Sequence, residues 1–351
     1  MSKLLFATFV ALLLSDGGVL AAETCALPQV ADTAALNPVA GSDLMTVPVA
    51  INGKPKKFLL DIGSGPMEVS QAAVTELSLP EAAKMTSTIQ LGGTGSMANM
   101  GSQQSLHMDA PVYDVKGNQV ANAMRARVRV GAFTIGGATA NNLQFIVASD
   151  GEIAKDAPYD GLFSTDILRQ YDVELDFAGK QISFLTPVKC TDPNQVVFWS
   201  HYEIGVIPMS VLNAKIVVPV TVEGHPLDAV IDTSSARTVL RRDIAELTLG
   251  YKAGAPGMMP SGDLKDGRGE TVYAHNFSQI AFAGGVTAVN VPALIETNSM
   301  LHDADSGVVL GSKARSTDTR IPDLTLGMDV LHQLHIYVVY GQKKLYVTAN
   351  Q

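Results

Sequence analysis

Residues 58–64, FLLDIGS, decide the fold, because residues 229–235, AVIDTSS, repeat their pattern later in the chain. In each stretch three apolar residues lead into an aspartate, Asp61 or Asp232, and two small residues stand two and three positions after it. A Val-Pro-Val triplet begins fourteen residues before each aspartate, and a glycine lies between triplet and aspartate in both copies. The pattern predicts two hairpins, each with a glycine-containing turn and a buried second strand that ends at the aspartate.

The repeat extends along most of the chain in the same order. The other matching blocks are 75–79 with 245–249, 136–146 with 284–294, 162–168 with 325–331, and 177–182 with 340–345. We therefore expect lobe 1 at residues 40–187, a connection at 188–213 and lobe 2 at 214–351. Runs rich in Val, Ile and Thr, with glycine and proline dispersed among them, favour short strands and turns. The expected fold is all-β, with two homologous lobes.

Composition and the first residues bear on partners and location. The 351 residues carry a net charge of −9, so a nucleic-acid partner is not expected, since phosphate binding needs clustered Lys and Arg. Residues 1–21 contain Lys3, an apolar run from Leu4 to Leu14 and small residues at a cleavage position, which predicts a signal peptide. No later apolar run is long enough to span a bilayer, which argues against a membrane anchor. We expect a secreted or periplasmic protein.

Cys25 and Cys190 are the two cysteines of the chain. In an oxidising compartment a lone pair of cysteines usually forms a disulfide, so the sequence predicts a bridge from the mature N-terminus to the end of lobe 1. Two unpaired buried thiols are the alternative. Metal binding is disfavoured, because no other Cys or His stands at ligand spacing beside either residue.

The two aspartate turns are the expected reactive site. Asp61 and Asp232 each follow a run of apolar residues, and in the first turn Gly63 permits close backbone approach while Ser64 supplies a donor. A single turn of this kind is ordinary turn chemistry. Two of them at matched positions of a duplicated lobe indicate a paired site.

This arrangement resembles the retropepsin-like and pepsin-like aspartic peptidases, more closely the bacterial two-lobed members. Their apolar-apolar-Asp turn is matched at both aspartates, and their late apolar-apolar-Gly element resembles residues 324–331, LTLGMDVL, and less closely 162–164, LFS. The resemblance implies two β-barrel lobes with a cleft between them and a catalytic dyad of Asp61 and Asp232. It also implies an endopeptidase that hydrolyses an extended peptide or protein substrate with an activated water.

The resemblance also implies roles for the residues around the dyad. Ser64 and Ser235 would hydrogen-bond the outer carboxylate oxygens, and Thr233 would supply the hydroxyl that braces the two turns. Two carboxylates held close together share one proton, so the sequence does not decide which aspartate is the acid and which the base. No metal, cofactor or covalent intermediate is implied, and a monomer is expected because both lobes are in one chain.

Three positions depart from the family pattern. Ile62 removes one half of a reciprocal hydroxyl brace, Ser234 adds a side chain where glycine is usual, and Ser164 replaces the late glycine but can donate a hydrogen bond. The departures leave open a second hypothesis, a protein with an impaired dyad that binds extended peptides without cleaving them. A third, a structural envelope protein without a cleft, requires the two aspartates to lie far apart.

Two segments rich in Gly, Ser, Asn and Met, residues 92–127 and 254–273, predict mobile loops. Within the first, Gly92, Gly93 and Thr94 are the best-placed candidates for a flap over the cleft. An exposed glycine loop without contact to a ligand is the alternative.

Four further polar residues have simpler explanations than chemistry. Asp166 and Asp329 occupy equivalent repeat positions and suit a helix start or a turn cap better than a catalytic pair. His332 and His335 form a His-x-x-His pair without an evident third ligand, so a metal site there is not expected.

Overall fold

The computed structural model consists mainly of β-strands, which confirms the all-β prediction. It describes residues 28–82, 112–113, 119–121, 126–149, 153–199, 203–212, 214–255, 257–266, 269–297 and 322–350. Its longest described helix, α1 (Gln71–Leu77), has 7 residues. The helices serve as short turns between strands.

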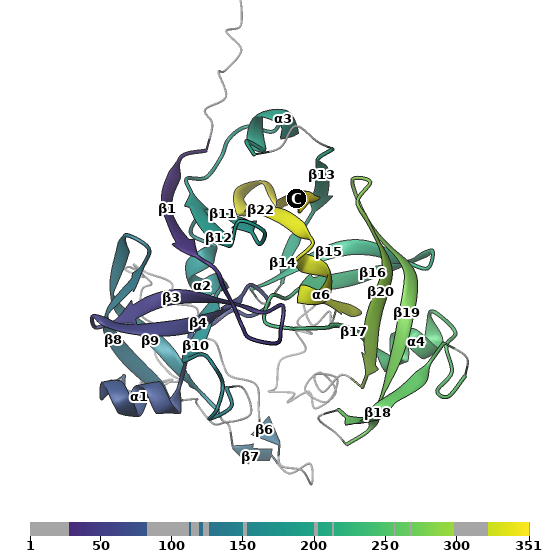
Figure 1. Ribbon diagram of the computed structural model, residues 1–351, viewed down its shortest axis with the longest axis horizontal. Coiled ribbons are helices and arrows are strands. Elements are labelled where there is room, and N and C mark those ends of the chain that lie inside the picture. The colour runs from purple at the N-terminus through teal and green to yellow at the C-terminus, as the bar shows by residue number, and fades with distance from the viewer. Residues whose placement is uncertain are drawn as a thin grey trace, which may run out of the picture.

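Strands of the first half close into a six-stranded barrel (Figure 1). Their order is β3-β4-β10-β5-β9-β8, and β3 also pairs with β8, which closes the ring. Their bounds are β3 (Met45–Ile51), β4 (Lys54–Asp61), β5 (Glu68–Ser70), β8 (Arg127–Ile135), β9 (Ala138–Ala148) and β10 (Gly161–Ser164). The short β2 (Asn37–Pro38) extends the sheet beside β3, and α2 (Thr165–Leu168) follows β10 directly.

The second half builds a matching barrel. The order β15-β16-β21-β17-β20-β19 repeats that of the first ring strand for strand, and β15 pairs with β19 to close it. The bounds are β15 (Lys215–Val222), β16 (His225–Ile231), β17 (Thr238–Arg241), β19 (Thr271–Phe282), β20 (Thr287–Glu296) and β21 (Leu324–Leu326), with β14 (Ser210–Leu212), β18 (Met259–Lys265), α4 (Arg242–Leu247) and α6 (Met328–Leu331) attached. The duplicated sequence therefore folds into duplicated structure.

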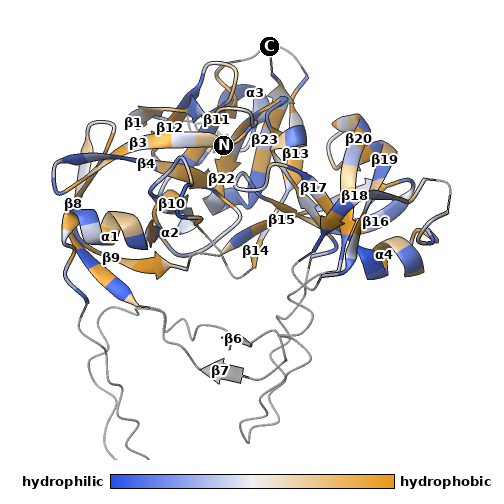
Figure 2. Ribbon diagram, turned by 60° about the horizontal axis from the view of Figure 1, so that its bottom comes forward, coloured by the Kyte–Doolittle hydropathy of each residue, from blue (hydrophilic) through white to orange (hydrophobic). Residues whose placement is uncertain are grey.

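A third sheet combines strands from both halves, which the sequence did not predict. Its order is β1-β12-β11-β22-β23-β13, so two hairpins meet at its centre, where β11 runs antiparallel to β22 (Figure 1). The bounds are β1 (Val30–Ala35), β11 (Asp172–Asp176), β12 (Gln181–Leu185), β13 (Gly205–Pro208), β22 (Leu334–Val339) and β23 (Lys344–Ala349), with α3 (Pro193–Val196) before β13 and η1 (Tyr340–Gln342) between the last two strands. β22 and β23 are almost wholly buried and mostly orange in Figure 2.

The same aspartate contact fixes the late strand of each barrel beside the strand that leads to the site. In the first barrel the backbone N–H of Lys57 donates to the Asp160 carboxylate at 3.0 Å, and the Asp160 N–H donates back to the Lys57 carbonyl oxygen at 2.7 Å. Asp228 and Asp323 make the equivalent pair of contacts in the second barrel, at 3.0 and 2.9 Å. These contacts align β10 with β4 and β21 with β16.

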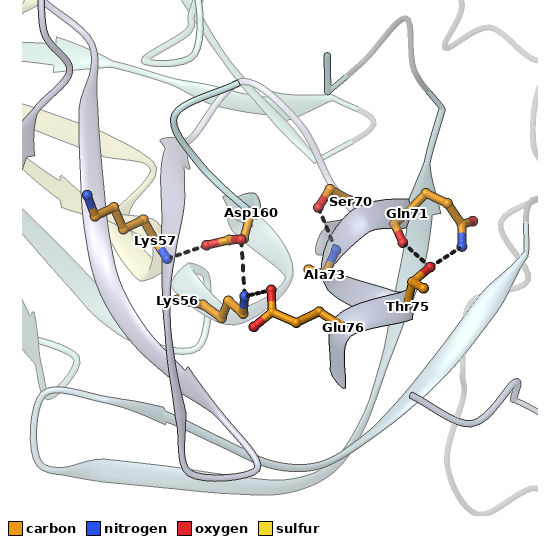
Figure 3. Close-up of polar contacts among 8 residues, drawn as sticks. All are labelled: Lys56, Lys57, Ser70, Gln71, Ala73, Thr75, Glu76 and Asp160. Atoms are coloured by element: carbon orange, nitrogen blue, oxygen red, sulfur yellow. Dashed lines mark hydrogen bonds and ion pairs between the residues drawn. The ribbon is translucent and has the colours of Figure 1, made fainter. Parts of the chain in front are cut away.

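An ion pair adds to this arrangement in the first barrel (Figure 3). The buried Lys56 ammonium lies 2.6 Å from Glu76 on α1 and 3.4 Å from Asp160. Ser70 caps α1, since its hydroxyl accepts a hydrogen bond from the Ala73 N–H at 3.2 Å. The helix is therefore tied both to β4 and to the segment that enters β10.

Apolar burial holds both barrels together. The largest buried cluster includes residues of both barrels and of the shared sheet. In the first barrel the rings of Phe58, Phe133 and Phe145 pack with centroid distances of 5.7, 6.0 and 5.3 Å. Burying one such side chain contributes about 1.5–3 kcal/mol, so these rings fix β4 firmly.

Two predicted loops have different outcomes. Residues 254–273 include β18 and the start of β19, so the prediction of a mobile loop is wrong there. β18 is exposed along nearly its whole length and is held by backbone pairing with β19, which explains why its sequence lacks a strand pattern. In residues 92–127 the structure describes the pair β6 (Val112–Tyr113) and β7 (Gln119–Ala121) and the start of β8.

Predictions for the signal peptide, for one cysteine and for the flap concern residues that the structure does not describe. The signal peptide, Cys25, and the flap residues Gly92, Gly93 and Thr94 lie outside the described residues. Cys190 lies within them and is buried. No helix in the described segments is long and apolar enough to cross a bilayer.

Candidate active site

The first aspartate turn holds its carboxylate with donors from its own loop. Asp61 is the last residue of β4, and only 2% of its surface is exposed. The Gly63 N–H donates to Asp61 Oδ1 at 2.9 Å, and the Ser64 hydroxyl donates to Oδ2 at 2.5 Å. Ser64 therefore makes the contact that the family resemblance implied.

The second turn uses a different serine. Asp232 Oδ1 accepts three hydrogen bonds, from the Ser234 N–H at 2.9 Å, the Ser234 hydroxyl at 2.7 Å and the Ser235 N–H at 3.2 Å. The Ser235 hydroxyl instead donates to the Arg237 carbonyl oxygen at 2.7 Å, so the expected contact from that hydroxyl is not made. Ser234, which sequence reasoning treated as a departure, supplies the side-chain donor. Three donors on one oxygen stabilise a negatively charged carboxylate.

The two turns touch across the lobes. The buried Thr233 hydroxyl donates to the Leu60 carbonyl oxygen at 2.8 Å and accepts from the Ile62 N–H at 3.1 Å. A Cβ placed on Gly63 would lie only 2.6 and 2.8 Å from the two Asp232 carboxylate oxygens. Both aspartates therefore belong to one site. Ile62 is buried and apolar, so one half of the reciprocal brace is absent, as its sequence implied.

The late elements, which contain Ser164 and Gly327, pack against the aspartate turns. The buried Ser164 hydroxyl donates to the Gly65 carbonyl oxygen at 2.9 Å, so this serine adds a hydrogen bond where the family has glycine. In the second barrel a Cβ on Gly327 would collide with the Arg237 backbone, whose nitrogen would lie at 2.9 Å. Each late element therefore packs directly against its own aspartate turn.

The environment of the dyad changes the acidity of Asp61. Burial, and then the negative charge of Asp232, raise the pKa of Asp61 to about 6 from an ordinary value of 3.8. Hydrogen bonds from Ser64 and Gly63 and the positive charge of Lys215 act in the opposite direction but are weaker. The site therefore holds a proton into the mildly acidic range.

Sequence reasoning missed three residues beside the dyad. Burial and then the charge of Asp61 raise the pKa of Tyr159, which shows that this partly buried ring lies near the carboxylate. Lys215 acts electrostatically on Asp61 from the start of β15. The Thr165 hydroxyl lies 2.6 Å from the Ser64 carbonyl oxygen and 3.0 Å from that of Ala214. Comparing the two copies position by position would have shown a lysine at 215 where the first copy has Leu44.

The other polar residues that the sequence singled out have partners of their own away from the two carboxylates. Asp166 and Asp329 are in the first turns of α2 and α6, and Asp329 accepts hydrogen bonds from the N–H and hydroxyl of Thr238 at 2.9 and 2.7 Å. His335 Nε2 lies 3.0 Å from Glu174, whereas His332 Nδ1 lies 2.5 Å from the Met328 carbonyl oxygen. Across the described segments, no three His, Cys, Asp or Glu side chains are grouped to hold a metal.

Comparison with known proteins identifies a family model that matches part of the chain. Residues 218–330 match the family model described as aspartyl protease, a span that includes Asp232 and the late element with Gly327. This stretch of the second lobe is therefore similar to the aspartyl protease family. The recognition of an aspartic peptidase-like family from the sequence is thereby confirmed.

Other comparisons give less. No curated protein matches the sequence of this aspartic peptidase-like chain. Among solved structures, the crystal structure of basic 7S globulin from soybean is similar over 91% of this chain and 94% of its own, with 9% sequence identity and a TM-score of 0.45.

Proposed function

We propose that the chain is an exported aspartic endopeptidase that hydrolyses peptide bonds with a water activated by Asp61 and Asp232. The observation that carries this proposal is the contact between the two turns, where Thr233 bridges the lobes and Gly63 lies against the Asp232 carboxylate. A structural protein has no need to bring two carboxylates into one buried site, because their mutual repulsion is unfavourable. The aspartyl protease match over the second half supports the same class.

The geometry suggests how the proton is shared. Asp61 is deeply buried with two donors and a raised pKa, whereas three donors converge on Asp232 Oδ1. We therefore place the proton on Asp61 and the charge on Asp232. Asp232 would take a proton from the attacking water, and Asp61 would donate its proton to the carbonyl oxygen of the peptide. Because the raised pKa of Asp61, about 6, keeps this carboxyl protonated below that pH, activity is expected at mildly acidic pH.

Export is part of the proposal and rests on residues 1–21, whose apolar run and small residues have the form of a signal peptide. The mature protein would act in the periplasm or outside the cell. There Cys25 and Cys190 would be exposed to oxidising conditions that favour a bridge.

Substitution of one aspartate tests the enzymatic proposal. Asp232→Asn keeps the shape of the side chain and removes its charge, so cleavage of a peptide library should be lost while thermal unfolding changes little. Asp263→Asn, at an exposed position of β18, is the matched control and should cleave normally. Wild-type cleavage that persists in Asp232→Asn, across pH 3 to 8, would refute the assignment.

A second candidate is a peptide-binding protein with an impaired dyad. Buried Ile62 favours it, because the second hydroxyl of the brace is missing. In that case the wild-type protein would bind a peptide with a tetrahedral hydroxyl in place of the scissile carbonyl, yet would show no turnover at any pH.

A further inference from the structure

A lysine lies beside the dyad on the second lobe. In the hairpin of β15 and β16, Ile216 pairs with Ile231, and the next position of this register places Lys215 opposite Asp232. Residues directly opposite in an antiparallel pair project from the same face of the sheet. The Lys215 side chain therefore shares the face from which the Asp232 carboxylate enters the site. Its charge also reaches Asp61 in the other lobe.

The position of Lys215 is held by the opposite lobe. The carbonyl oxygen of the preceding residue, Ala214, lies 3.0 Å from the Thr165 hydroxyl, which is also 2.6 Å from the Ser64 carbonyl oxygen. Thr165 thus connects the first aspartate turn to the segment that begins β15. Lys215 is partly buried and its backbone is fixed at the junction of the lobes.

The fold itself does not require a cation here. In the first hairpin Thr46 pairs with Leu59, so the position opposite Asp61 is Leu44. The first hairpin therefore forms with an apolar residue at the position that Lys215 occupies in the second. Within the described segments, Lys215 is in no ion pair at 4.0 Å or less. A lysine ammonium carries three hydrogen-bond donors with which it can bind a ligand.

We propose that Lys215 makes this cleft selective for peptides that carry a carboxylate side chain next to the bond to be cleaved. The inference rests on the proposed function, because it names the substrate class of the same site. An extended peptide that places its carbonyl at the dyad brings a neighbouring side chain to Lys215, and an ammonium in a partly buried position binds a carboxylate with a charge-assisted hydrogen bond.

The test compares peptides that differ only in Glu against Gln at one position, scanned on both sides of the cleaved bond. Wild-type kcat/KM should favour Glu at one position by about tenfold or more, since a hydrogen bond to a charged group contributes about 1.5–3 kcal/mol. Lys215→Met should abolish this ratio, and Lys215→Arg should retain most of it. Lys252→Met, an exposed lysine on the same lobe, is the matched control and should leave the ratio unchanged.

Two outcomes would overturn the inference. Wild-type protein could show no Glu preference at any position, or Lys215→Met could shift the pH profile for Glu and Gln peptides equally and preserve their ratio. The second result would mean that Lys215 acts only on the dyad.

Binding separates this inference from the proposed hydrolysis. Dissociation constants for the same peptide pairs, made with a reduced peptide bond that cannot be cleaved, report selectivity without turnover. A Glu preference in binding with no cleavage of ordinary peptides would support the substrate class and refute the enzyme. Cleavage of ordinary peptides with no Glu preference in either assay would support the enzyme and refute the substrate class.

Discussion

The closest approach of the two turns predicts the effect of a single added methyl group. Gly63→Ala would place a Cβ 2.6 Å from one carboxylate oxygen of Asp232, whereas ordinary van der Waals contact begins at 3.4 Å. One of the two groups must therefore move by about 0.8 Å. Gly63 does not have a positive φ, so alanine is acceptable to the backbone and the effect comes from the side chain alone.

The displacement sets the expected magnitude. A misplacement of about 1 Å in a catalytic group can cost about a hundredfold in rate, so kcat/KM should fall by about 30- to 100-fold. Overpacking of a filled interior costs about 1–3 kcal/mol, so the free energy of unfolding should fall by a similar amount. Peptide hydrolysis and urea denaturation measure the two effects separately, and the loss of stability is expected even if the chain binds peptides without cleaving them.

Gly341→Ala is the matched control, because a Cβ there meets no atom within 4 Å and the backbone φ is not positive. It should change neither activity nor stability by a measurable amount. If Gly63→Ala behaves like Gly341→Ala in both assays, the two turns do not approach each other as described, and the argument for a shared site fails.

Three other predictions follow from contacts near the site. Thr233→Val should lower the free energy of unfolding by about 2–4 kcal/mol in urea denaturation, because the Leu60 carbonyl oxygen and the Ile62 N–H of the first lobe lose their partner. Thr233→Ser keeps the hydroxyl and should recover most of this loss. Equal losses in the two variants would contradict the brace. The raised pKa of Asp61 means that the folded state holds a proton between pH 3.8 and about 6 that the unfolded state has released, so this group makes stability fall as pH rises through that window. Asp61→Asn should therefore gain on the order of 3 kcal/mol relative to wild type between pH 4 and pH 7 in denaturation curves, and parallel pH dependences would refute the shift. Ser70→Ala should cost about 1 kcal/mol in thermal unfolding through loss of the α1 cap, with little change in peptide hydrolysis; a large loss of hydrolysis would mean that the helix contributes to the site.

The duplicated hairpins could be predicted because they are local. The spacing from Val-Pro-Val to aspartate is the same in both copies, and β16 follows β4 by the same 171 residues that separate Asp61 from Asp232. Alternating burial and a glycine turn are enough to specify such a hairpin. The paired aspartates followed from the repeat.

Contacts between distant segments could not be predicted in the same way. The shared sheet depends on the register between β11 and β22, which no pattern within either strand specifies. The exchange of roles between Ser234 and Ser235 depends on which hydroxyl points toward Asp232, a difference of one residue within a tight turn. Lys215 and Tyr159 become neighbours of Asp61 only after the barrels close and meet.

The centre of the shared sheet shows what the duplication means for assembly. Glu174 and Tyr337 lie opposite each other there. They are equivalent residues of the two copies, since Glu174 lies ten positions after Ser164 and Tyr337 ten positions after the matching Gly327. A two-fold axis that relates the copies therefore passes through this pair, and β11 pairs antiparallel with β22, its equivalent strand in the other copy. A half-length chain would carry one central strand of the shared sheet, but it could bring two aspartate turns together only by pairing with a second chain at sufficient concentration. Joining the copies covalently makes that encounter intramolecular and keeps the centre assembled at any dilution.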